Sequence, residues 1–470
     1  MSGLLVAGTT SDAGKSIVTT GLCRAFVRRG VRVAPYKAQN MSNNSMVTAD
    51  GAEIGRAQWV QARAARAEPE AAMNPVLLKP GSDLRSHLVL LGEPAGEVGS
   101  GSWEIGRRHL AEAAHAAYDD LAARFDVVIA EGAGSPAEIN LRAGDFVNMG
   151  LARHADLPTV VVGDVDRGGV FAAFVGTLAL LEAADQALVA GFVVNKFRGD
   201  LALLTPGIDT LTRLTGRPTY GVLPWHPDLW LDSEDALDLD SRRAAGGTAR
   251  VAVVRLPRIS NFTDVDALGL EPDLDVVFVS DAREVSDADL VVLPGTRSTI
   301  SDLAWLRSRG LDTAIVSHAR AGRPVLGICG GCQMLGRTIA DPDGVEGTPT
   351  TVDGLGLLDL TTTFGTEKVL RTHEPAGYEI HHGRVTGERT AGAVTGTMVH
   401  GVLEDDEHRA SYLRRALGVT SRASFPAARE RRLDLLGDLV EEHLDVDALL
   451  GLATHGAPAG LPVLPPGGAA

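Results

Sequence analysis

Short apolar runs rich in Val, Ile and Leu alternate with segments of helical periodicity along most of this chain. In the first half, runs that predict β-strands lie at 4–7, 31–34, 126–130, 159–162 and 188–194. The pattern starts again in the second half, at 251–257, 275–280, 289–295 and 324–329. Apolar strands that alternate with helices are typical of parallel sheets covered by helices. The pattern therefore predicts an α/β protein with two parallel-sheet domains.

The two halves are separated by a polar, acidic stretch of small residues, LDSEDALDLDSRRAAGGTAR, at 231–250. This composition is typical of a linker, which we place at 233–249, between a first domain at 1–232 and a second at 250–445. The last residues, HGAPAGLPVLPPGGAA at 455–470, are rich in Pro and Gly and predict a disordered tail.

The N-terminal segment LLVAGTTSDAGKSIVTT has the order of a phosphate-binding loop: an apolar strand, a turn and a helix. The turn ends in Gly14, Lys15 and Ser16. In such a loop the backbone N–H groups face phosphates, the lysine reaches the outer phosphates, and the hydroxyl binds magnesium. We therefore expect ATP and Mg²⁺ here, with Gly8 and Thr10 also beside the phosphates.

The loop departs from the strict P-loop pattern at one position. Thr9 stands where the first glycine is usual, and Gly8 comes one residue earlier. That departure is shared with the dethiobiotin-synthetase-like branch of P-loop enzymes, which this segment resembles. The resemblance implies a dethiobiotin-synthetase-like parallel sheet for the first domain.

Three further polar residues are candidates for the nucleotide site. Glu131 follows the strand in DVVIAEGAGS, and because ligands gather at the carboxyl ends of parallel strands, we expect it to bind magnesium. Asp12 is a second candidate for the metal, with a turn-forming role as the alternative. Asn195, in VVNKFRGD, is a candidate for the adenine edge, again with a turn role as the alternative.

The segment VLGICGGCQMLG, at 325–336, holds two of the three cysteines. Its glycines and Cys329 lie between a predicted strand and a helix predicted at 333–339. This is the nucleophile elbow with sulfur in place of oxygen, so it predicts a nucleophilic Cys329 and a packed, unreactive Cys332. A zinc clip or a redox pair is the alternative, but the other cysteine, Cys23, has no Cys or His nearby in sequence.

A histidine pair raises the question of a second metal site. His381 and His382 follow Glu379 closely in GYEIHHG. Because no further ligand cluster supports a metal, we expect these side chains to line a pocket or to stabilise the fold.

Composition narrows the class of protein. Of 470 residues, 44 are Lys or Arg and 60 are Asp or Glu, which gives a formal net charge of −16. The sequence also contains no run of basic residues. Both features argue against nucleic acid as a partner. No apolar stretch approaches the roughly 20 residues of a membrane span. The first residues lack the features of a signal peptide, and three cysteines suit a reducing compartment, so we expect a cytoplasmic location. Nothing in the sequence predicts the oligomeric state.

Longer motifs carry a family resemblance. They are YKAQNMSNNS at 36–45, MNPVLLKP at 73–80, EGAGSPAEINL at 131–141, DVDRGGVFA at 164–172, VVNKFRGD at 193–200, RLPRISNFTDVDAL at 255–268, LPGTRSTISDL at 293–303 and GYEIHHG at 377–383. In these motifs and in their order, from 3 to 417, the chain closely resembles the cobyric acid synthase family.

The resemblance implies a P-loop amide synthetase fused to a class I glutamine amidotransferase domain. It further implies a glutamine-dependent amide ligase of cobalamin biosynthesis, which takes ammonia from L-glutamine. With ATP, such an enzyme amidates the b, d, e and g carboxylates of a corrinoid, adenosylcobyrinic acid a,c-diamide.

The resemblance also implies roles for residues of the second domain. Cys329 would be the glutaminase nucleophile, and His400, in TMVHGVLEDD, its base. We expect the backbone N–H groups of Gly295 and Gly330 to form the oxyanion hole. Many class I glutaminases have a glutamate two residues after the histidine. Val402 stands there, so the third member of the triad stays open, as does the role of nearby Glu404.

The polar stretch at 36–45 belongs to the predicted synthetase site. We expect Lys37 to assist at the ATP phosphates. Gln39, Asn40 and Asn43 are candidates for binding the substrate.

Three other protein classes are alternatives. Cobyrinic acid a,c-diamide synthase shares the architecture, but YKAQNMSNNS and GICGG favour cobyric acid synthase. CTP synthase also joins a synthetase to a glutaminase, with different motifs. A partition-type ATPase would carry a lysine at the position of Thr10, and a glutaminase would serve no purpose in such a switch.

Overall fold

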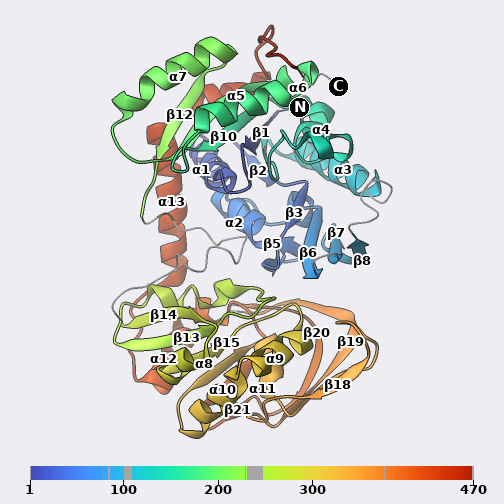
Figure 1. Ribbon diagram of the computed structural model, residues 1–470, viewed down its shortest axis with the longest axis vertical. Coiled ribbons are helices and arrows are strands. Elements are labelled where there is room, and N and C mark those ends of the chain that lie inside the picture. The colour runs from blue at the N-terminus through green and yellow to red at the C-terminus, as the bar shows by residue number, and fades with distance from the viewer. Residues whose placement is uncertain are drawn as a thin grey trace.

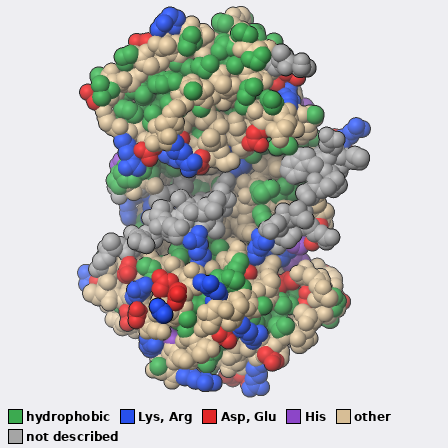
Figure 2. All heavy atoms as spheres, viewed as in Figure 1, with side chains coloured by type: hydrophobic (Ala, Val, Ile, Leu, Met, Phe, Trp, Pro, Cys, Tyr) green, Lys and Arg blue, Asp and Glu red, His purple; other side chains and the backbone are tan. Residues whose placement is uncertain are grey.

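The computed structural model describes residues 2–82, 85–99, 108–227, 229, 247–374 and 376–467. Two lobes lie one above the other, and each is built around its own sheet (Figure 1). In the space-filling view they are joined across a narrower waist (Figure 2). Of the predicted linker at 233–249, residues 233–246 lie outside the described part of the chain. Strand β13 begins at Ala249, the last residue of the predicted linker.

The first lobe contains a six-stranded parallel sheet of order β12-β11-β10-β1-β9-β2. Its central strands are buried along their whole length, which explains their unbroken apolar runs. All five predicted strands are present, although the second begins at Val33 rather than at 31. The bounds are β1 (Gly3–Gly8), β2 (Val33–Tyr36), β9 (Val127–Glu131), β10 (Thr159–Asp164), β11 (Val189–Phe197) and β12 (Thr219–Pro224).

Helices cover both faces of this sheet (Figure 1). Helix α1 begins directly after the predicted phosphate-binding turn and packs against β1 and β9. The principal helices are α1 (Lys15–Arg28), α3 (Arg108–Arg124), α4 (Met149–Ala155), α5 (Val170–Leu180), α6 (Ala183–Gln186) and α7 (Leu201–Thr215). The predicted α/β class and P-loop arrangement are confirmed for this lobe.

An extension between β2 and α3 faces the second lobe (Figure 1), and the sequence did not predict it. It contains a four-stranded sheet of order β3-β6-β7-β8, a hairpin of β4 and β5, and helix α2. The bounds are β3 (Gln39–Met41), β4 (Ser45–Val47), β5 (Glu53–Gly55), α2 (Arg56–Ala64), β6 (Val76–Ser82), β7 (Arg85–Leu90) and β8 (Glu93–Gly99).

The second lobe has a sheet of order β14-β13-β15-β16-β22-β21, parallel except at β21, and a second sheet of order β18-β17-β19-β20. The strands are β13 (Ala249–Val254), β14 (Leu274–Val279), β15 (Leu290–Leu293), β16 (Val325–Ile328), β17 (Thr338–Asp341), β18 (Thr350–Asp353), β19 (Leu360–Thr372), β20 (Tyr378–Gly387), β21 (Thr390–Ala391) and β22 (Val394–Thr397). The helices are α8 (Ala282–Ser286), α9 (Thr299–Ser308), α10 (Leu311–Arg320), α11 (Gly330–Leu335) and α12 (Asp406–Leu417).

The helix predicted at 333–339 is wrong in both bounds. Helix α11 begins at Gly330, directly after Cys329, and ends at Leu335. Thr338 and Ile339 belong to β17, where they pair with β18 and β19. The prediction extended the helix because a short apolar run does not distinguish a buried helix from a buried strand.

The predicted second domain, 250–445, includes a helix that packs on the first lobe. In α13 (Phe425–His443), Glu430 pairs with Arg24 at 3.0 Å and Asp438 pairs with Arg28 at 2.7 Å, both on α1. Leu449 of α14 (Val446–His455) shares a core with Leu4 of β1. The chain therefore returns to the first lobe after α12, and the predicted boundary at 445 needs correction.

The tail predicted to be disordered, 455–470, makes specific contacts as far as Gly467. The Pro462 carbonyl accepts a hydrogen bond from the buried Arg217 guanidinium at 2.9 Å. The Leu464 N–H donates to the Gln186 side chain at 2.8 Å, and the Gly467 N–H donates to a carbonyl of α5 at 3.2 Å. The prediction of disorder from composition was wrong, because backbone groups of this segment form hydrogen bonds with buried polar side chains. Residues 468–470 lie outside the described part of the chain.

Within the described residues, we find no helix with the length and apolar character that a membrane span requires.

Candidate active sites

The phosphate-binding loop connects β1 to α1, with Lys15 as the first residue of the helix. The Lys15 ammonium donates to the Thr10 carbonyl at 2.9 Å and to the Ser11 and Gly134 carbonyls at 3.2 Å. Gly14 has φ 97°, and a Cβ atom there would lie 1.9 Å from the Asn195 Nδ2. A Cβ at Gly8 would lie 3.0 Å from the Lys15 Cγ, so both glycines allow the close packing that this loop requires.

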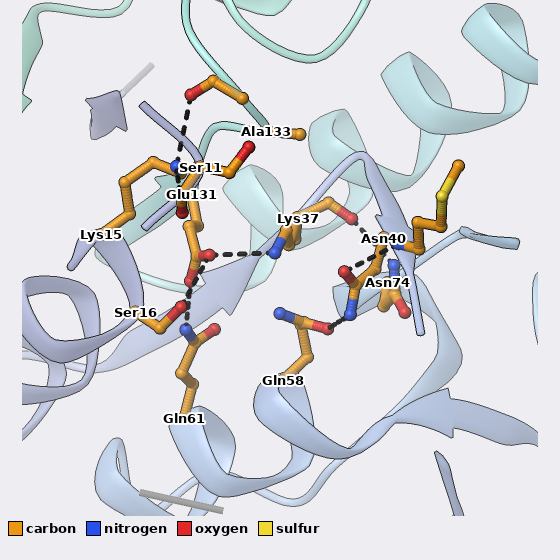
Figure 3. A network of polar contacts seen from close by, with 12 residues as sticks. Ser11, Lys15, Ser16, Lys37, Asn40, Gln58, Gln61, Asn74, Glu131 and Ala133 are labelled. Atoms are coloured by element: carbon orange, nitrogen blue, oxygen red, sulfur yellow. Dashed lines mark hydrogen bonds and ion pairs between the residues drawn. The ribbon is translucent and has the colours of Figure 1, made fainter. Parts of the chain in front are cut away.

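Glu131, the last residue of β9, is the centre of a buried polar cluster next to this loop (Figure 3). Its Oε1 accepts from the Lys37 ammonium at 2.9 Å and from the Ser16 hydroxyl at 3.0 Å. Its Oε2 accepts from the Gln61 amide at 2.6 Å. Burial alone would raise the pKa of Glu131, but Lys37, Lys15 and Gln61 outweigh it and lower the pKa. The carboxylate is therefore charged at neutral pH.

This cluster fits the predicted magnesium site. The Glu131 carboxylate and the Ser16 hydroxyl are 3.0 Å apart and offer the oxygen ligands that Mg²⁺ prefers. Among the described residues, no three His, Cys, Asp or Glu side chains are grouped to hold a metal ion. A metal bound here would therefore take its other ligands from phosphate and water, as is usual for Mg²⁺ with nucleotides.

Asp12, the second candidate for the metal, lies apart from this cluster. Its carboxylate forms an ion pair with Arg167 and accepts from the Thr10 hydroxyl at 2.9 Å. The Lys196 ammonium donates to the Asp12 carbonyl at 3.0 Å. The structure thus brings Ser16 and Glu131 together but does not bring Asp12 to them.

Asn195 lies beneath the loop, near the end of β11. Its amide nitrogen donates to the Ala13 carbonyl at 2.9 Å, and it packs against Gly14. In this geometry Asn195 positions the phosphate-binding loop. A contact with adenine stays a prediction.

The polar stretch at 36–45 lines the extension next to Glu131. Asn40 is buried, and its amide donates to the Gln58 side chain at 3.0 Å, while its own oxygen accepts from the Met41 N–H at 2.9 Å (Figure 3). The Asn43 amide donates to the Pro80 carbonyl at 3.5 Å. Gln39 is partly exposed at the start of β3. These contacts give Asn40 and Asn43 structural roles, and substrate binding by the three residues stays a prediction.

Gln61 was not predicted as a site residue. It lies on α2, which carries Arg56 and Gln58 on the same short helix, and it reaches the Glu131 carboxylate beside the Ser16 side chain (Figure 3). No local pattern marks Gln61, because its role depends on how the extension packs against the parallel sheet.

Cys329 lies at the turn between β16 and α11, with φ 51° and ψ −109°. Positive φ is costly for a residue with a Cβ atom and is typical of a nucleophile elbow. The turn is packed tightly: a Cβ atom at Gly331 would lie 2.0 Å from the Leu293 carbonyl oxygen. The Cys329 N–H donates to the Thr397 carbonyl at 2.7 Å, which connects the turn to β22. The predicted elbow is therefore present in the structure.

His400 lies beside Cys329 and is fully buried. Its Nδ1 lies 2.7 Å from the Asp264 Oδ2, and the Gly401 N–H donates to the other oxygen of Asp264 at 2.8 Å. Burial alone would lower the pKa of His400, but Asp264 and the hydrogen-bonded Cys329 sulfur outweigh it and raise the pKa to about 10. The three residues have the arrangement of a nucleophile, a base and an orienting acid.

Asp264 fills the position that the sequence left open. It lies in the short helix η5 (Phe262–Val265), within the family motif RLPRISNFTDVDAL, but 136 residues before His400. Glu404 has a different role: its carboxylate pairs with Arg56 at 2.6 Å and with Arg429 at 2.8 Å, where the two lobes meet. Val402 does not need to be a glutamate, because Asp264 already contacts the histidine.

Cys332 is fully buried on α11. Burial raises the pKa of its thiol to about 12, so the thiol is uncharged and unreactive at neutral pH. All three cysteines are free thiols. The geometry therefore favours one working cysteine over a redox pair.

Gly295 and Gly330 are adjacent to the Cys329–His400 pair. A Cβ atom at Gly295 would lie 3.0 Å from the His400 Cε1. A Cβ at Gly330 would lie 2.6 Å from the Cγ2 of Thr296, the residue after Gly295. Both backbones therefore border the same small space, as an oxyanion hole requires, and their role there stays a prediction.

A pocket opens beside Cys329, and both lobes contribute to it. From the second lobe come Arg297, Glu346, Lys368, His381 and His382, and from the first lobe comes Lys79. His381 donates to Glu379 at 3.1 Å, and burial lowers the pKa of His382 to about 4. Their position fits the expected pocket role.

Contacts across the waist bring the extension close to this pocket. The buried Glu53 of β5 pairs with Lys79 at 2.6 Å and also with Lys368 of β19. The Ser45 N–H donates to the Asn261 side chain at 2.9 Å. The pocket beside Cys329 is therefore completed by Lys79 of the first lobe, which these contacts hold in place.

Comparison with known proteins agrees with this division into two sites. Residues 4–238 match the CobQ/CobB/MinD/ParA nucleotide binding domain, and residues 250–414 match the CobB/CobQ-like glutamine amidotransferase domain, a match that ends before α13. Cobyric acid synthase of Mycolicibacterium vanbaalenii is 71% identical over 488 residues, covering 99% of this chain and 100% of the relative. That of Mycobacterium ulcerans is 71% identical over 489 residues, with the same coverage. The chain therefore belongs to the cobyric acid synthase family.

Proposed function

We propose that this protein uses ATP and glutamine to amidate the b, d, e and g carboxylates of adenosylcobyrinic acid a,c-diamide, giving adenosylcobyric acid in cobalamin biosynthesis. The observation that carries the proposal is the pairing, in one chain of this family, of a Cys329–His400–Asp264 triad with a phosphate-binding loop beside Glu131. The corrinoid is a small-molecule partner, and we expect the reaction to occur in the cytoplasm.

The triad supplies ammonia. The Cys329 thiolate attacks the carbon of the glutamine side-chain amide, and the backbone N–H groups of Gly295 and Gly330 stabilise the oxyanion that forms. His400, oriented by Asp264, protonates the leaving nitrogen, so that ammonia departs and a thioester remains on Cys329. Water then cleaves the thioester, which releases glutamate and restores the thiol.

The first lobe activates the acceptor. A substrate carboxylate takes the γ-phosphoryl group of ATP, which gives an acyl phosphate and ADP. Lys15 and Lys37 supply positive charge where negative charge develops on the transferred group. A magnesium ion held by Ser16 and Glu131 would neutralise further phosphate charge. Ammonia then attacks the acyl carbon, and phosphate leaves to give the amide.

The contact between the lobes suits a transfer of ammonia from one site to the other. Free ammonia is mostly protonated in water near neutral pH and is then not a nucleophile. A sheltered path from Cys329 to the acyl phosphate would avoid this loss, and Lys79 of the first lobe already borders the glutaminase pocket.

The direct test is incubation of the protein with ATP, Mg²⁺, glutamine and adenosylcobyrinic acid a,c-diamide, followed by product mass. Four successive replacements of a carboxylate by an amide would support the proposal. No change in mass with this substrate, together with two amidations of cobyrinic acid, would favour cobyrinic acid a,c-diamide synthase instead.

A further inference from the structure

The pocket beside Cys329 contains three cationic side chains, and two of them have a carboxylate partner within the protein. Lys79 and Lys368 both pair with Glu53, which is fully buried between the lobes. One oxygen of Glu53 accepts from Lys79 at 2.6 Å, and the other accepts from Lys368. Each ammonium group therefore has a carboxylate partner within the protein, and the two share the single negative charge of Glu53.

Arg297 is the third cation of this pocket. It follows Gly295 by two residues, on the loop between β15 and α9, and its backbone N–H donates to the Arg258 carbonyl at 2.9 Å. Within the described part of the chain, its guanidinium has no hydrogen bond or ion pair. Burial lowers the pKa of Arg297, and the carboxylates of Glu346, Glu53 and Glu97 act only through their charge. A largely buried guanidinium without a direct partner is costly unless a ligand supplies one.

The neighbouring histidines do not compete for an anionic ligand. His381 and His382 line the same pocket, and burial lowers the pKa of both, that of His382 to about 4. Both rings are therefore uncharged near neutral pH. Among the described residues of this pocket, Arg297 is the cation whose charged group has no carboxylate partner.

The pocket also contains a fixed carboxyl group, that of Glu346, whose pKa is raised by burial. The Glu346 carboxylate accepts the Thr299 N–H at 2.9 Å and the Ile300 N–H at 3.0 Å, one on each oxygen. These bonds hold the carboxylate at the start of α9 and leave further lone pairs on both oxygens. One pocket thus presents an unpaired guanidinium and an oriented carboxylate beside the nucleophile.

Glutamine is the complement of this pair, because its α-carbon carries both a carboxylate and an ammonium group. We propose that Arg297 binds the α-carboxylate of glutamine and that Glu346 receives its α-ammonium group, while the side-chain amide reaches Cys329. This assignment rests on the proposed glutaminase function and identifies the residues that select glutamine over simple amides.

The test compares three amides in ammonia release by the full-length protein: glutamine, glutaramic acid, which lacks the α-ammonium, and 4-aminobutanamide, which lacks the α-carboxylate. Arg297→Met should lower kcat/KM for glutamine and for glutaramic acid by about 100-fold, because charged hydrogen bonds are lost. The loss should lie mainly in KM. With 4-aminobutanamide, kcat/KM should change by no more than a few-fold.

Lys368→Met is the matched control, since it also removes a cation from the pocket. Its effect should not depend on whether the amide carries a carboxylate. Arg297→Lys keeps the charge but loses the bidentate geometry, so it should show a smaller loss with the same dependence on the carboxylate. Equal losses by Arg297→Met on all three amides, or a carboxylate-dependent loss in Lys368→Met, would overturn the assignment.

Failure of this inference is distinguishable from failure of the proposed function. Ammonia release from glutamine by the unaltered protein requires no corrinoid, whereas the proposed function also requires amide synthesis. If the unaltered protein does not release ammonia from glutamine, both fail. If it does and Arg297→Met shows no carboxylate-dependent loss, only the assignment of Arg297 fails.

Discussion

The Nδ1 of His400 lies 2.7 Å from the Asp264 carboxylate, although the two residues are 136 positions apart in the chain. This contact places the ring proton on Nδ1 and leaves Nε2 for the exchange of a proton with Cys329. It also stabilises the charged imidazolium, since the carboxylate helps to raise the pKa of His400 to about 10.

Asp264→Asn should therefore lower glutamine-dependent amide synthesis by on the order of 100-fold or more, because the amide no longer fixes the tautomer or stabilises the imidazolium. Synthesis with an ammonium salt should stay within a few-fold, because the ATP site is in the other lobe. The assay is product formation with each nitrogen donor. A variant that keeps most of its glutamine-dependent rate would show that Asp264 is not the third member of the triad.

The same contact should affect stability as a function of pH. The pKa of His400 is raised in the folded protein to about 10, from an ordinary value near 6.5. Its contribution to the free energy of unfolding is therefore complete below about pH 6.5 and is lost as the pH rises towards 10. The difference in urea midpoint between the parent and Asp264→Asn should be largest near pH 6.5 and shrink towards pH 10. A difference that stays constant over this range would contradict the assigned pKa.

Cys332→Ala tests whether one cysteine or two carry the chemistry. Because the Cys332 thiol is buried and its pKa is raised to about 12, it should serve only as packing. Removing the sulfur should leave glutamine hydrolysis within a few-fold of the parent and lower the unfolding temperature slightly. If hydrolysis is abolished while synthesis with ammonium persists, the paired-cysteine interpretation would return.

Lys15 and Glu131 should act on one transition state. Lys15→Ala and Glu131→Gln should each lower amide synthesis by on the order of 100-fold or more, as expected when electrostatic stabilisation of phosphoryl transfer is removed. The double variant should be far less than multiplicatively worse than either single variant. Glutamine hydrolysis without synthesis should persist at a basal level in all three.

Ammonia and amidated corrinoid, measured in the same reaction, decide this prediction. Asp12→Asn is the matched control, because Asp12 lies within the loop but pairs with Arg167 instead of joining the Glu131 cluster. Full ATP-dependent synthesis in Glu131→Gln would mean that Glu131 is not the metal ligand.

Local patterns in the sequence were sufficient for most strands of the two parallel sheets, for the phosphate-binding loop and for Cys329. The buried strands are continuous apolar runs, and the turns that carry Lys15 and Cys329 have their glycines within a few positions. Asp264 could not be assigned in this way, because only the fold brings η5 to His400, in the segment that follows β22. Gln61 was missed for the same reason.

Helix α13 shows a different limit of sequence analysis. Its apolar positions predict burial but not the lobe on which the helix packs. Its acidic residues pair with Arg24 and Arg28 of α1, more than 400 positions earlier in the chain. No local pattern contains that pairing, so the predicted domain boundary followed the order of the chain rather than the packing.

The central claim is that one chain holds two separate sites, a glutaminase at Cys329 and an ATP-dependent synthetase at Lys15 and Glu131. Replacing Cys329 by serine and measuring amide formation with glutamine and with an ammonium salt tests this claim most directly. We predict that glutamine-dependent synthesis disappears while ammonium-dependent synthesis stays near the parent rate. Loss of both activities in a folded Cys329→Ser protein would contradict the claim.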